Sequence, residues 1–348
     1  MIRPVRFMDL PALRTIFEGS FTEEFERRGV DMTGQFVRWQ QMYPLVRALS
    51  LFPNPYQYTM NLLVAEVDGA IAGFVQTSPG NHQRSRWHID YLAVAPERRH
   101  HGIAGRLVDH VCDQYGSRGV HAFTIEVDTR NLKALGLFAK KGFRQYATLS
   151  YYQLSPEALR AHDPAEPPLG LRQYRPKDAA ALLELHNACT PASVRLVDSR
   201  SVGDFELGFI EHNLSRWRRK LGLSEDLRYV VENDQRQIVG YLRVLGHLRP
   251  MPLSLRLMVH PGYEHLLDSL LQFGLGKLRG FPENIVLAWA PDYQAEKGKA
   301  LEAAGFTLLT ADHLLVRDSL LTIRMPLNTA VQKVDEAAFK PAYCEPRS

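Results

Sequence analysis

Residues 94–107, "VAPERRHHGIAGRL", place small and basic residues where an apolar, strand-like segment ends. A helix that begins near Gly102 presents backbone N–H groups without partners inside the helix, and its dipole adds partial positive charge. Gly102 and Ala104 allow an oxygen to approach that backbone closely. Four neighbouring side chains add positive charge or hydrogen-bond donors: Arg99, His100, His101 and Arg106. The segment can therefore hold a phosphate or a diphosphate, although the spacing alone also fits a basic turn before an ordinary helix.

The elements around this loop alternate between strand and helix patterns. A hairpin is expected at residues 62–67 and 71–77, because Asp68-Gly69 is a strong turn signal between apolar runs. Further strands are expected at residues 87–94, 121–127 and 148–154, the last of which would close the sheet.

Two helices are expected between these strands. Residues 102–115 carry an apolar face, and a shorter helix begins at Asn131 as its cap and stops at Gly142. The pattern predicts an α/β (α+β) fold with a mixed, mostly antiparallel sheet flanked by helices.

The second half of the chain repeats the first. "IRPVRFMDLPAL" at 2–13 aligns with "LRQYRPKDAAAL" at 171–182, "VAP" at 94–96 recurs as "VHP" at 259–261, and "KKGF" at 140–143 recurs as "AAGF" at 303–306. The matches keep the same order, so an internal duplication explains them most simply. We expect domains at 1–154 and 170–327, with a proline-rich linker at 155–169 and a polar tail at 328–348.

The repeat does not preserve the phosphate loop. In this register Glu264 stands opposite Arg99, Leu267 opposite Gly102 and Ser269 opposite Ala104. A glutamate would repel a phosphate, and a leucine adds bulk where an oxygen must approach. We therefore expect the second half to keep the fold without holding the same ligand.

The composition is that of an ordinary soluble protein. The chain has 348 residues, a net charge of +4 and 45% hydrophobic residues, which gives no general argument for nucleic-acid binding. Its three cysteines have no metal-site or disulfide spacing, and no apolar run is long enough to span a membrane. We expect a cytoplasmic protein without metal, nucleic-acid or membrane binding, and a homodimer is compatible with the sequence.

The loop and a second segment together resemble the GNAT N-acetyltransferase superfamily. "LAVAPERRHHGIA" is similar to the acetyl-CoA signature Arg/Gln-x-x-Gly-x-Gly/Ala after a strand that ends in Leu-x-Val-x-Pro, and "NLKALGLFAKKGF" at 131–143 is similar to the second block of that family. The resemblance covers residues 1–154. It implies two tandem GNAT-like domains, the first with an intact acetyl-CoA motif and the second degenerate.

The resemblance also implies which residues contact acetyl-CoA, the co-substrate. The loop would hold the pyrophosphate, and the backbone near Leu92 and Val94 would pair with the pantetheine arm like an added strand, beside a bulge or splay. The residues assigned in this way are Leu92, Ala93, Val94, Arg99, His100, His101, Gly102, Ile103, Ala104, Gly105, Arg106, Asn131 and Phe138.

Acetyl transfer to an amine requires a base, because an alkyl amine is protonated at neutral pH. Glu126 lies five residues before Asn131, a spacing that resembles the base glutamate of ribosomal-protein alanine acetyltransferases, and Asp90 on the adjacent strand is the second candidate. Both also fit solvated or ion-paired strand residues. Phe138 stands where the family has a tyrosine that protonates the leaving thiolate, so that acid is absent. Tyr151 or Tyr152 could replace it, although strand tyrosines are more often packing residues.

The acceptor is not specified by the sequence. Aromatic residues in the variable region at 17–60 could line its pocket or pack in the core: Trp39, Tyr43, Phe52, Tyr56 and Tyr58. We expect an acetyl-CoA-dependent N-acetyltransferase that acts on a primary amine of a small molecule or a protein, with the second half helping to wall the acceptor site. A CoA-binding pseudoenzyme or sensor without acetyl transfer is the alternative.

Overall fold

The computed structural model describes residues 1–27, 61–80, 85–163, 165–206, 224–248 and 251–319, with side chains left undescribed at 22–27. Its strands form a single twelve-stranded sheet in the order β1-β2-β3-β4-β5-β12-β6-β11-β10-β9-β8-β7. Only the pairs β4–β5 and β10–β11 are parallel. The expected α/β fold with a mixed, mostly antiparallel sheet is confirmed.

The first half contains the elements that the sequence predicts, with small shifts of their ends. Its strands are β1 (Ile2–Pro4), β2 (Leu62–Val67), β3 (Ala70–Pro79), β4 (Arg86–Val94), β5 (Ala122–Asp128) and β6 (Arg144–Leu154). Its helices are α1 (Leu10–Arg27), α3 (Ile103–Gly116) and α4 (Leu132–Lys140), and a short helix that was not predicted, α5 (Pro156–Ala161), lies in the stretch expected to be a linker. Asp68 and Gly69 both have positive φ, as the predicted hairpin turn requires.

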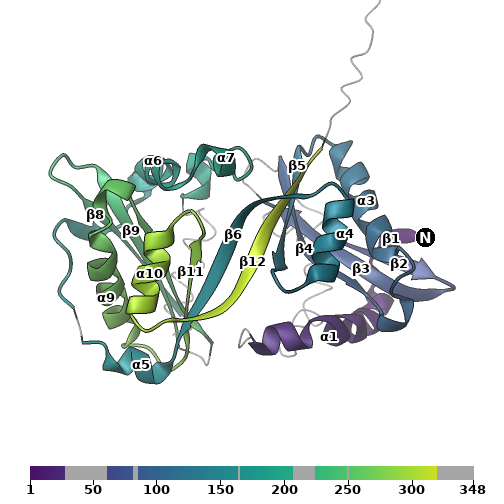
Figure 1. The fold of residues 1–348 in the computed structure, drawn as a ribbon, viewed down its shortest axis with the longest axis horizontal. Coiled ribbons are helices and arrows are strands. Elements are labelled where there is room, and N and C mark those ends of the chain that lie inside the picture. The colour runs from purple at the N-terminus through teal and green to yellow at the C-terminus, as the bar shows by residue number, and fades with distance from the viewer. Residues whose placement is uncertain (28–60, 81–84, 164, 207–223, 249–250, 320–348) are drawn as a thin grey trace, which may run out of the picture.

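The second half repeats this order. Its strands are β7 (Leu171–Gln173), β8 (Ser224–Glu232), β9 (Ile238–His247), β10 (Leu253–Val259), β11 (Val286–Pro291) and β12 (Thr307–Asp318). Its helices are α6 (Ala179–Cys189), α7 (Ala192–Arg195), α9 (Leu266–Leu278) and α10 (Ala295–Ala303). In Figure 1, α9 and α10 cover one side of the sheet in this half, as α3 and α4 do in the other.

The two halves share a matching ion-pair network at corresponding positions. Arg3 binds Asp9 at 2.7 Å and Glu66 at 2.7 Å. Arg172 binds Asp178 at 2.7 Å and Glu232 at 2.6 Å. Hydrogen bonds from Arg3 hold the pKa of Asp9 below its ordinary value, whereas burial works in the opposite direction. This repeated geometry supports the duplication inferred from the sequence.

The last strand of each half lies between strands of the other half. β12 pairs with β5 along its length, from Asp312 opposite Asp128 to Asp318 opposite Ala122, and with β6 on its other edge. β6 then pairs with β11, so the prediction that residues 148–154 close the sheet of the first half is wrong. Figure 1 shows both strands as long ribbons that cross between the halves.

The exchange of strands also joins the hydrophobic cores. Leu315 of β12 packs with the cluster beneath α3, which includes Leu107 and Phe123. Leu154 of β6 packs instead with the cluster beneath α9, which includes Leu270. Each core is completed by a strand from the other half, so the two halves are held together by backbone pairing as well as by side-chain burial.

Candidate functional site

The predicted phosphate loop has the geometry of an open helix start. Gly102 precedes α3 with a φ of +70°, and no side chain caps the helix there. His100 also has a positive φ, of +67°, so the backbone is turned twice within three residues. The Arg106 guanidinium stabilises the loop by donating to the carbonyl oxygen of His101 at 3.0 Å. These features leave the first N–H groups of α3 available to an anion.

A cleft begins where β4 and β5 separate. The two strands pair at Arg86–His88 with Ala122–Thr124, after which the edge of β4 that faces β5 has no strand partner among the described residues. On the other edge of β4 the register shifts, since Gln76 pairs with Tyr91 and Thr77 with Ile89, which leaves Asp90 in a bulge. The bulged and splayed strand that the family resemblance implied is therefore present.

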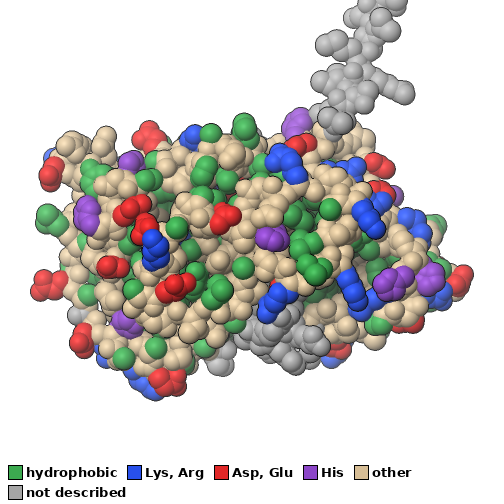
Figure 2. Space-filling view, viewed as in Figure 1, with side chains coloured by type: hydrophobic (Ala, Val, Ile, Leu, Met, Phe, Trp, Pro, Cys, Tyr) green, Lys and Arg blue, Asp and Glu red, His purple; other side chains and the backbone are tan. Residues whose placement is uncertain are grey.

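The cavity in this cleft has a volume of about 640 Å³. Most residues assigned to acetyl-CoA from the sequence line it: Leu92, Ala93, Val94, Arg99, His100, Gly102, Ile103, Ala104, Gly105, Asn131 and Phe138. His101 and Arg106 do not line it; they hold the loop through the hydrogen bond described above. Figure 2 shows Lys, Arg and His side chains gathered over the half that carries α3 and α4. We refer to this space as the cofactor cavity.

Phe138 forms a buried wall of the cofactor cavity. It is 2% exposed and packs edge-on against Phe143, with ring centroids 5.1 Å apart. Asn131 caps α4 by accepting from the backbone N–H of Ala134 at 3.1 Å, as predicted. A phenyl ring has no proton to donate, so this wall contributes shape and not acid catalysis.

Asp90 faces the cofactor cavity in a largely desolvated environment. Burial raises the pKa of its carboxyl group above the ordinary value, against the opposing effects of Ser78 and His88. The Ser78 hydroxyl donates to Asp90 Oδ1 at 2.8 Å, while Oδ2 is buried without a hydrogen-bond partner among the described residues. A carboxyl group of this kind can exchange a proton nearer neutral pH than an exposed aspartate.

Glu126 is exposed to the cleft, as the alternation of β5 predicts. The apolar neighbours Phe123, Ile125 and Val127 point into the core on the other face. The Tyr151 hydroxyl donates to Glu126 Oε2 at 2.7 Å. Tyr152, in contrast, is buried in the core of the second half, with its hydroxyl 3.3 Å from Glu302. Of the two tyrosines considered as acids, only Tyr151 reaches the site, where it orients the carboxylate.

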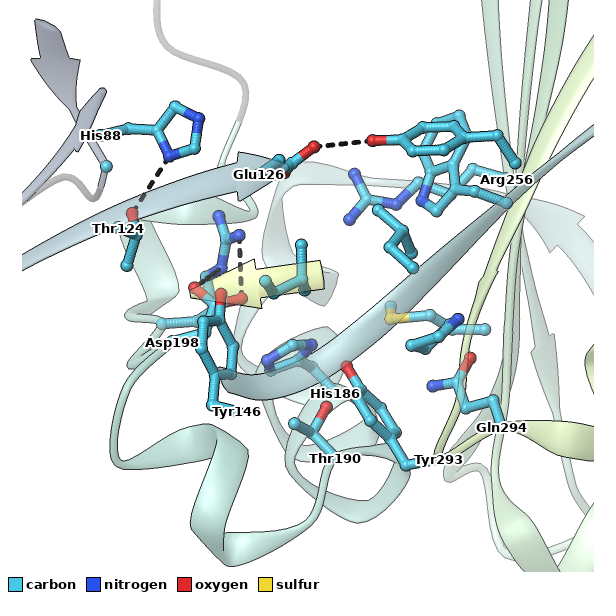
Figure 3. Close-up of a pocket in the computed structure, with 18 of the residues that line it drawn as sticks. His88, Thr124, Glu126, Tyr146, His186, Thr190, Asp198, Arg256, Tyr293 and Gln294 are labelled. Atoms are coloured by element: carbon cyan, nitrogen blue, oxygen red, sulfur yellow. Dashed lines mark hydrogen bonds and ion pairs between the residues drawn. The ribbon is translucent and has the colours of Figure 1, made fainter. Parts of the chain in front are cut away.

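A second cavity of about 490 Å³ lies between the two halves. The first half contributes Glu126, Tyr151 and His88, and the second half contributes residues of α6, β10, β11 and α10. Figure 3 shows these side chains converging from both sides, with the Glu126–Tyr151 hydrogen bond on the rim of the group. We refer to this space as the interface cavity.

The two cavities share three lining residues, His88, Ile125 and Glu126. His88 Nδ1 lies 3.1 Å from the Thr124 hydroxyl, which fixes the ring at the point where β4 and β5 separate. Asp90 lines only the cofactor cavity, and Tyr151 lines only the interface cavity. Glu126 is thus the only carboxylate of the described chain that lines both.

Basic groups dominate one wall of the interface cavity, to which both halves contribute. Asp198 is shared by two guanidinium groups, that of Arg86 at 2.5 Å and that of Arg200 at 3.1 Å. Burial acts to raise the pKa of Asp198, but the two arginines lower it by more than burial raises it. The pKa therefore lies below its ordinary value, and the carboxylate stays charged. The Arg256 guanidinium lies over the Trp289 ring, 5.6 Å from its centroid.

Neutral polar groups complete the interface cavity. Burial lowers the pKa of His186, which keeps its ring neutral, and burial raises the pKa of Tyr293 to about 12. Burial also raises the pKa of Tyr146. These groups can donate or accept hydrogen bonds without adding charge.

The corresponding gap in the second half holds a lysine side chain and borders the interface cavity. β10 and β11 also pair briefly, at Leu253–Ser254 with Val286–Leu287, and then separate. Lys297 of α10 lies there with 7% exposure and donates to the carbonyl oxygen of Leu257 at 3.0 Å. Burial and the nearby Arg256 lower the pKa of this lysine to about 7.

The helix start of the second half also lacks the open loop. His265 occupies the N-cap position of α9 with a φ of −58° and makes no side-chain capping bond, and the N–H of Leu267 donates to the carbonyl oxygen of Glu264 at 2.9 Å. When the first residues of α3 and α9 are aligned, His265 rather than Leu267 is the counterpart of Gly102. The register predicted from the sequence is therefore shifted by two residues. The conclusion that a glycine is missing there is unchanged.

The sequence reasoning missed the residues that the second half places in the interface cavity. Arg256 was visible as a charged residue in the apolar strand "LSLRLMV", and Lys297 as a charge on the buried side of a helix. The aromatic residues proposed for the acceptor, from Trp39 to Tyr58, lie outside the described residues, as does the tail at 328–348. Within the described chain, no group of histidine, cysteine or acidic residues has a metal-binding arrangement, and no helix has the length and apolarity needed to cross a membrane.

The fold is shared with known acetyltransferases. A GCN5-related N-acetyltransferase from Sphaerobacter thermophilus superposes with a TM-score of 0.56, at 16% identity over 92% of this chain and 95% of its own. A tandem GNAT protein from the clavulanic acid biosynthesis pathway superposes with a TM-score of 0.50, at 16% identity over 74% of this chain and 82% of its own. The chain therefore has a tandem GNAT fold.

The sequence comparisons concern the first half of the chain. Residues 10–143 match the acetyltransferase (GNAT) family. An uncharacterised N-acetyltransferase of Bacillus subtilis (strain 168), YhfO, is 30% identical over 97 residues, so the matched segment spans 27% of this chain and 65% of that relative. Residues 10–143 are therefore similar in sequence to GNAT acetyltransferases, and the chain as a whole shares the tandem GNAT fold.

Proposed function

We propose that the protein is an acetyl-CoA-dependent N-acetyltransferase whose acceptor amine binds between the two halves. The observation that carries this proposal is the meeting of two cavities at Glu126. One cavity has the loop and the free strand edge that suit CoA, and the other opens onto the same carboxylate from the opposite direction. Two reactants held in this way would meet at one residue.

The cofactor cavity fits acetyl-CoA in its residues and its backbone. The open start of α3 at Gly102 suits the pyrophosphate, with Arg99 and His100 beside it. The unpaired edge of β4 past His88 suits the amide groups of the pantetheine arm, which can pair with it as a strand does. Backbone N–H groups along this edge would also stabilise negative charge on the thioester oxygen.

The reaction requires a neutral amine next to the thioester. Glu126 would accept the proton of the incoming amine, directly or through water, while Tyr151 holds its carboxylate in place. The amine nitrogen then bonds to the acetyl carbon, and the carbon–sulfur bond breaks with its electron pair leaving on sulfur. Because Phe138 has no proton, sulfur would leave as the thiolate, whose pKa of about 8.5 makes this tolerable near neutral pH.

Asp90 is the second candidate for proton transfer. Its raised pKa suits it to hold a proton nearer neutral pH than an exposed aspartate does. Its place in the bulge, inside the cofactor cavity and away from the interface cavity, favours a role near the thioester over one at the amine.

Substitution of Glu126 by Gln tests the assignment. Loss of a general base is expected to lower kcat about 10²–10⁴-fold while CoA affinity stays within about twofold. Release of free thiol from acetyl-CoA with a panel of primary amines measures the rate, and calorimetry measures CoA binding. Glu157→Gln, an exposed acid on α5 outside both cavities, is the matched control and should leave both quantities unchanged.

The alternative is a CoA-binding sensor, and Phe138 is the observation that favours it. The same experiment separates the two functions. Tight CoA binding without thiol release for any amine of the panel would favour the sensor, whereas turnover that Glu126→Gln removes would favour the enzyme. Turnover that persists in the Glu126→Gln variant would indicate that Asp90 acts as the base.

A further inference from the structure

Among the described residues, the guanidinium of Arg256 in the interface cavity makes no hydrogen bond or ion pair. It lies over the Trp289 ring, with the guanidinium carbon 5.6 Å from the ring centroid. Its side chain stays accessible from the cavity although it projects from the middle of an apolar strand. Stacking covers one face of a guanidinium and leaves its N–H edge free.

The position of Arg256 relative to Glu126 follows from three contacts. Arg256 covers Trp289, and Trp289 of β11 lies directly opposite Tyr151 of β6 in the sheet. Tyr151 in turn donates to Glu126. Cross-strand neighbours have Cβ atoms about 4.5–5.5 Å apart, so one small molecule can reach both Arg256 and Glu126. Figure 3 shows both residues on the same side of the cavity.

The remaining charges do not satisfy Arg256. Asp198 is already shared by Arg86 and Arg200, which leaves that group with surplus positive charge. Lys297 adds further positive charge when protonated. A simple cationic amine would be repelled by this wall, whereas an amine with an anionic group at its other end would match it.

We infer that the acceptor is a small primary amine that also carries a carboxylate, which Arg256 binds while the amino group faces Glu126. The guanidinium edge forms two parallel hydrogen bonds with the two oxygens of a carboxylate. A cavity of about 490 Å³ suits a molecule of the size of an amino acid or a short peptide. The inference rests on the proposed function, because it uses Glu126 as the amine end of the site.

The test compares pairs of amines that differ in the anionic group. Suitable probes are 4-aminobutyrate with butylamine, alanine with alaninamide, and phosphoethanolamine with ethanolamine. The expected result is that kcat/KM is about 10–100-fold higher for the carboxylates than for their partners without a carboxylate. Arg256→Met should remove this preference by raising KM for the carboxylates and leave the amines without a carboxylate unchanged. A preference for phosphoethanolamine over both carboxylates would overturn the assignment of a carboxylate.

The matched control is Arg160→Met, which removes an exposed arginine of α5 and should keep the preference. Equal rates for the paired amines, or a loss with Arg256→Met that is the same for both members, would overturn the inference. Thermal shift with each amine alone gives a readout that does not depend on turnover. If carboxylates stabilise the protein through Arg256 while no amine releases thiol, the carboxylate site holds and the proposed function fails.

Discussion

The two halves of the chain contain the same strand separation with opposite contents. In the first half, β4 and β5 part after three residue pairs and leave a cavity of about 640 Å³. In the second half, β10 and β11 part after two pairs, and the Lys297 ammonium binds the Leu257 carbonyl in the gap. The separation therefore belongs to the fold, while ligand access depends on the side chain beside it.

The helix starts differ in the same way. Gly102 gives α3 an open, uncapped start in the left-handed backbone region, whereas the first turn of α9 uses the N–H of Leu267 in a bond to Glu264. The ion-pair networks of Arg3 and Arg172, by contrast, have kept the same partners. The comparison teaches that the duplication preserved the framework and changed the groups that would contact a ligand.

The largest expected effect in this comparison comes from substitution of Gly102, with Gly262 as the control. Gly102→Ala would place a Cβ in the path of the phosphate and strain a position with φ +70°. We expect CoA binding to weaken about 10–100-fold, which is about 1.4–2.8 kcal/mol. The matched variant Gly262→Ala, in the turn before α9, would meet His260 Nδ1 at an ordinary 3.5 Å and should leave CoA binding unchanged.

Calorimetric titration of both variants with CoA provides the measurement. Far-UV circular dichroism confirms that each variant is folded. Equal losses in the two variants would break the comparison, because they would show that the second half contributes to the same binding event.

A smaller effect is expected from Lys297. Its pKa of about 7 in the folded state lies below the ordinary lysine value, so between pH 7 and about 10 the unfolded state binds more protons and stability from this group rises with pH. The neighbouring groups that set this pKa, after burial, are Arg256 and Cys189. Lys297→Met should reduce the rise of stability with pH, while its side chain still fills the gap between β10 and β11.

Urea unfolding of the wild type and of Lys297→Met at several pH values between 7 and 10 tests this. The difference between their unfolding free energies is expected to shrink steadily as pH rises, with the variant favoured most at pH 7. A difference that does not change with pH would mean that Lys297 is protonated in the fold throughout this range.

Most of the first half could be predicted from the sequence because its signals are local. The turn at Asp68-Gly69, the Asn131 cap and the glycine at position 102 each have a short-range physical cause. The exchange of β6 and β12 could not be predicted, since both are long strands and their sequences do not specify which neighbour each will pair with. That choice depends on tertiary packing.

The two parts of the candidate site also differ in how far they can be predicted from the sequence. The cofactor loop is one contiguous segment, so its residue types and spacing identify it. The interface cavity combines Glu126 with Arg256 and Lys297, which are 130 or more positions away along the chain. The exchanged strands bring these residues together, and no short sequence pattern indicates that they lie close in space.

The stoichiometry of CoA binding tests the central claim most directly. We predict that calorimetric titration of the whole chain gives one CoA per chain, and that Gly102→Ala weakens that single event. Two equivalents, or one equivalent that Gly102→Ala leaves unchanged, would contradict the account of a first gap that binds CoA and a second one that does not.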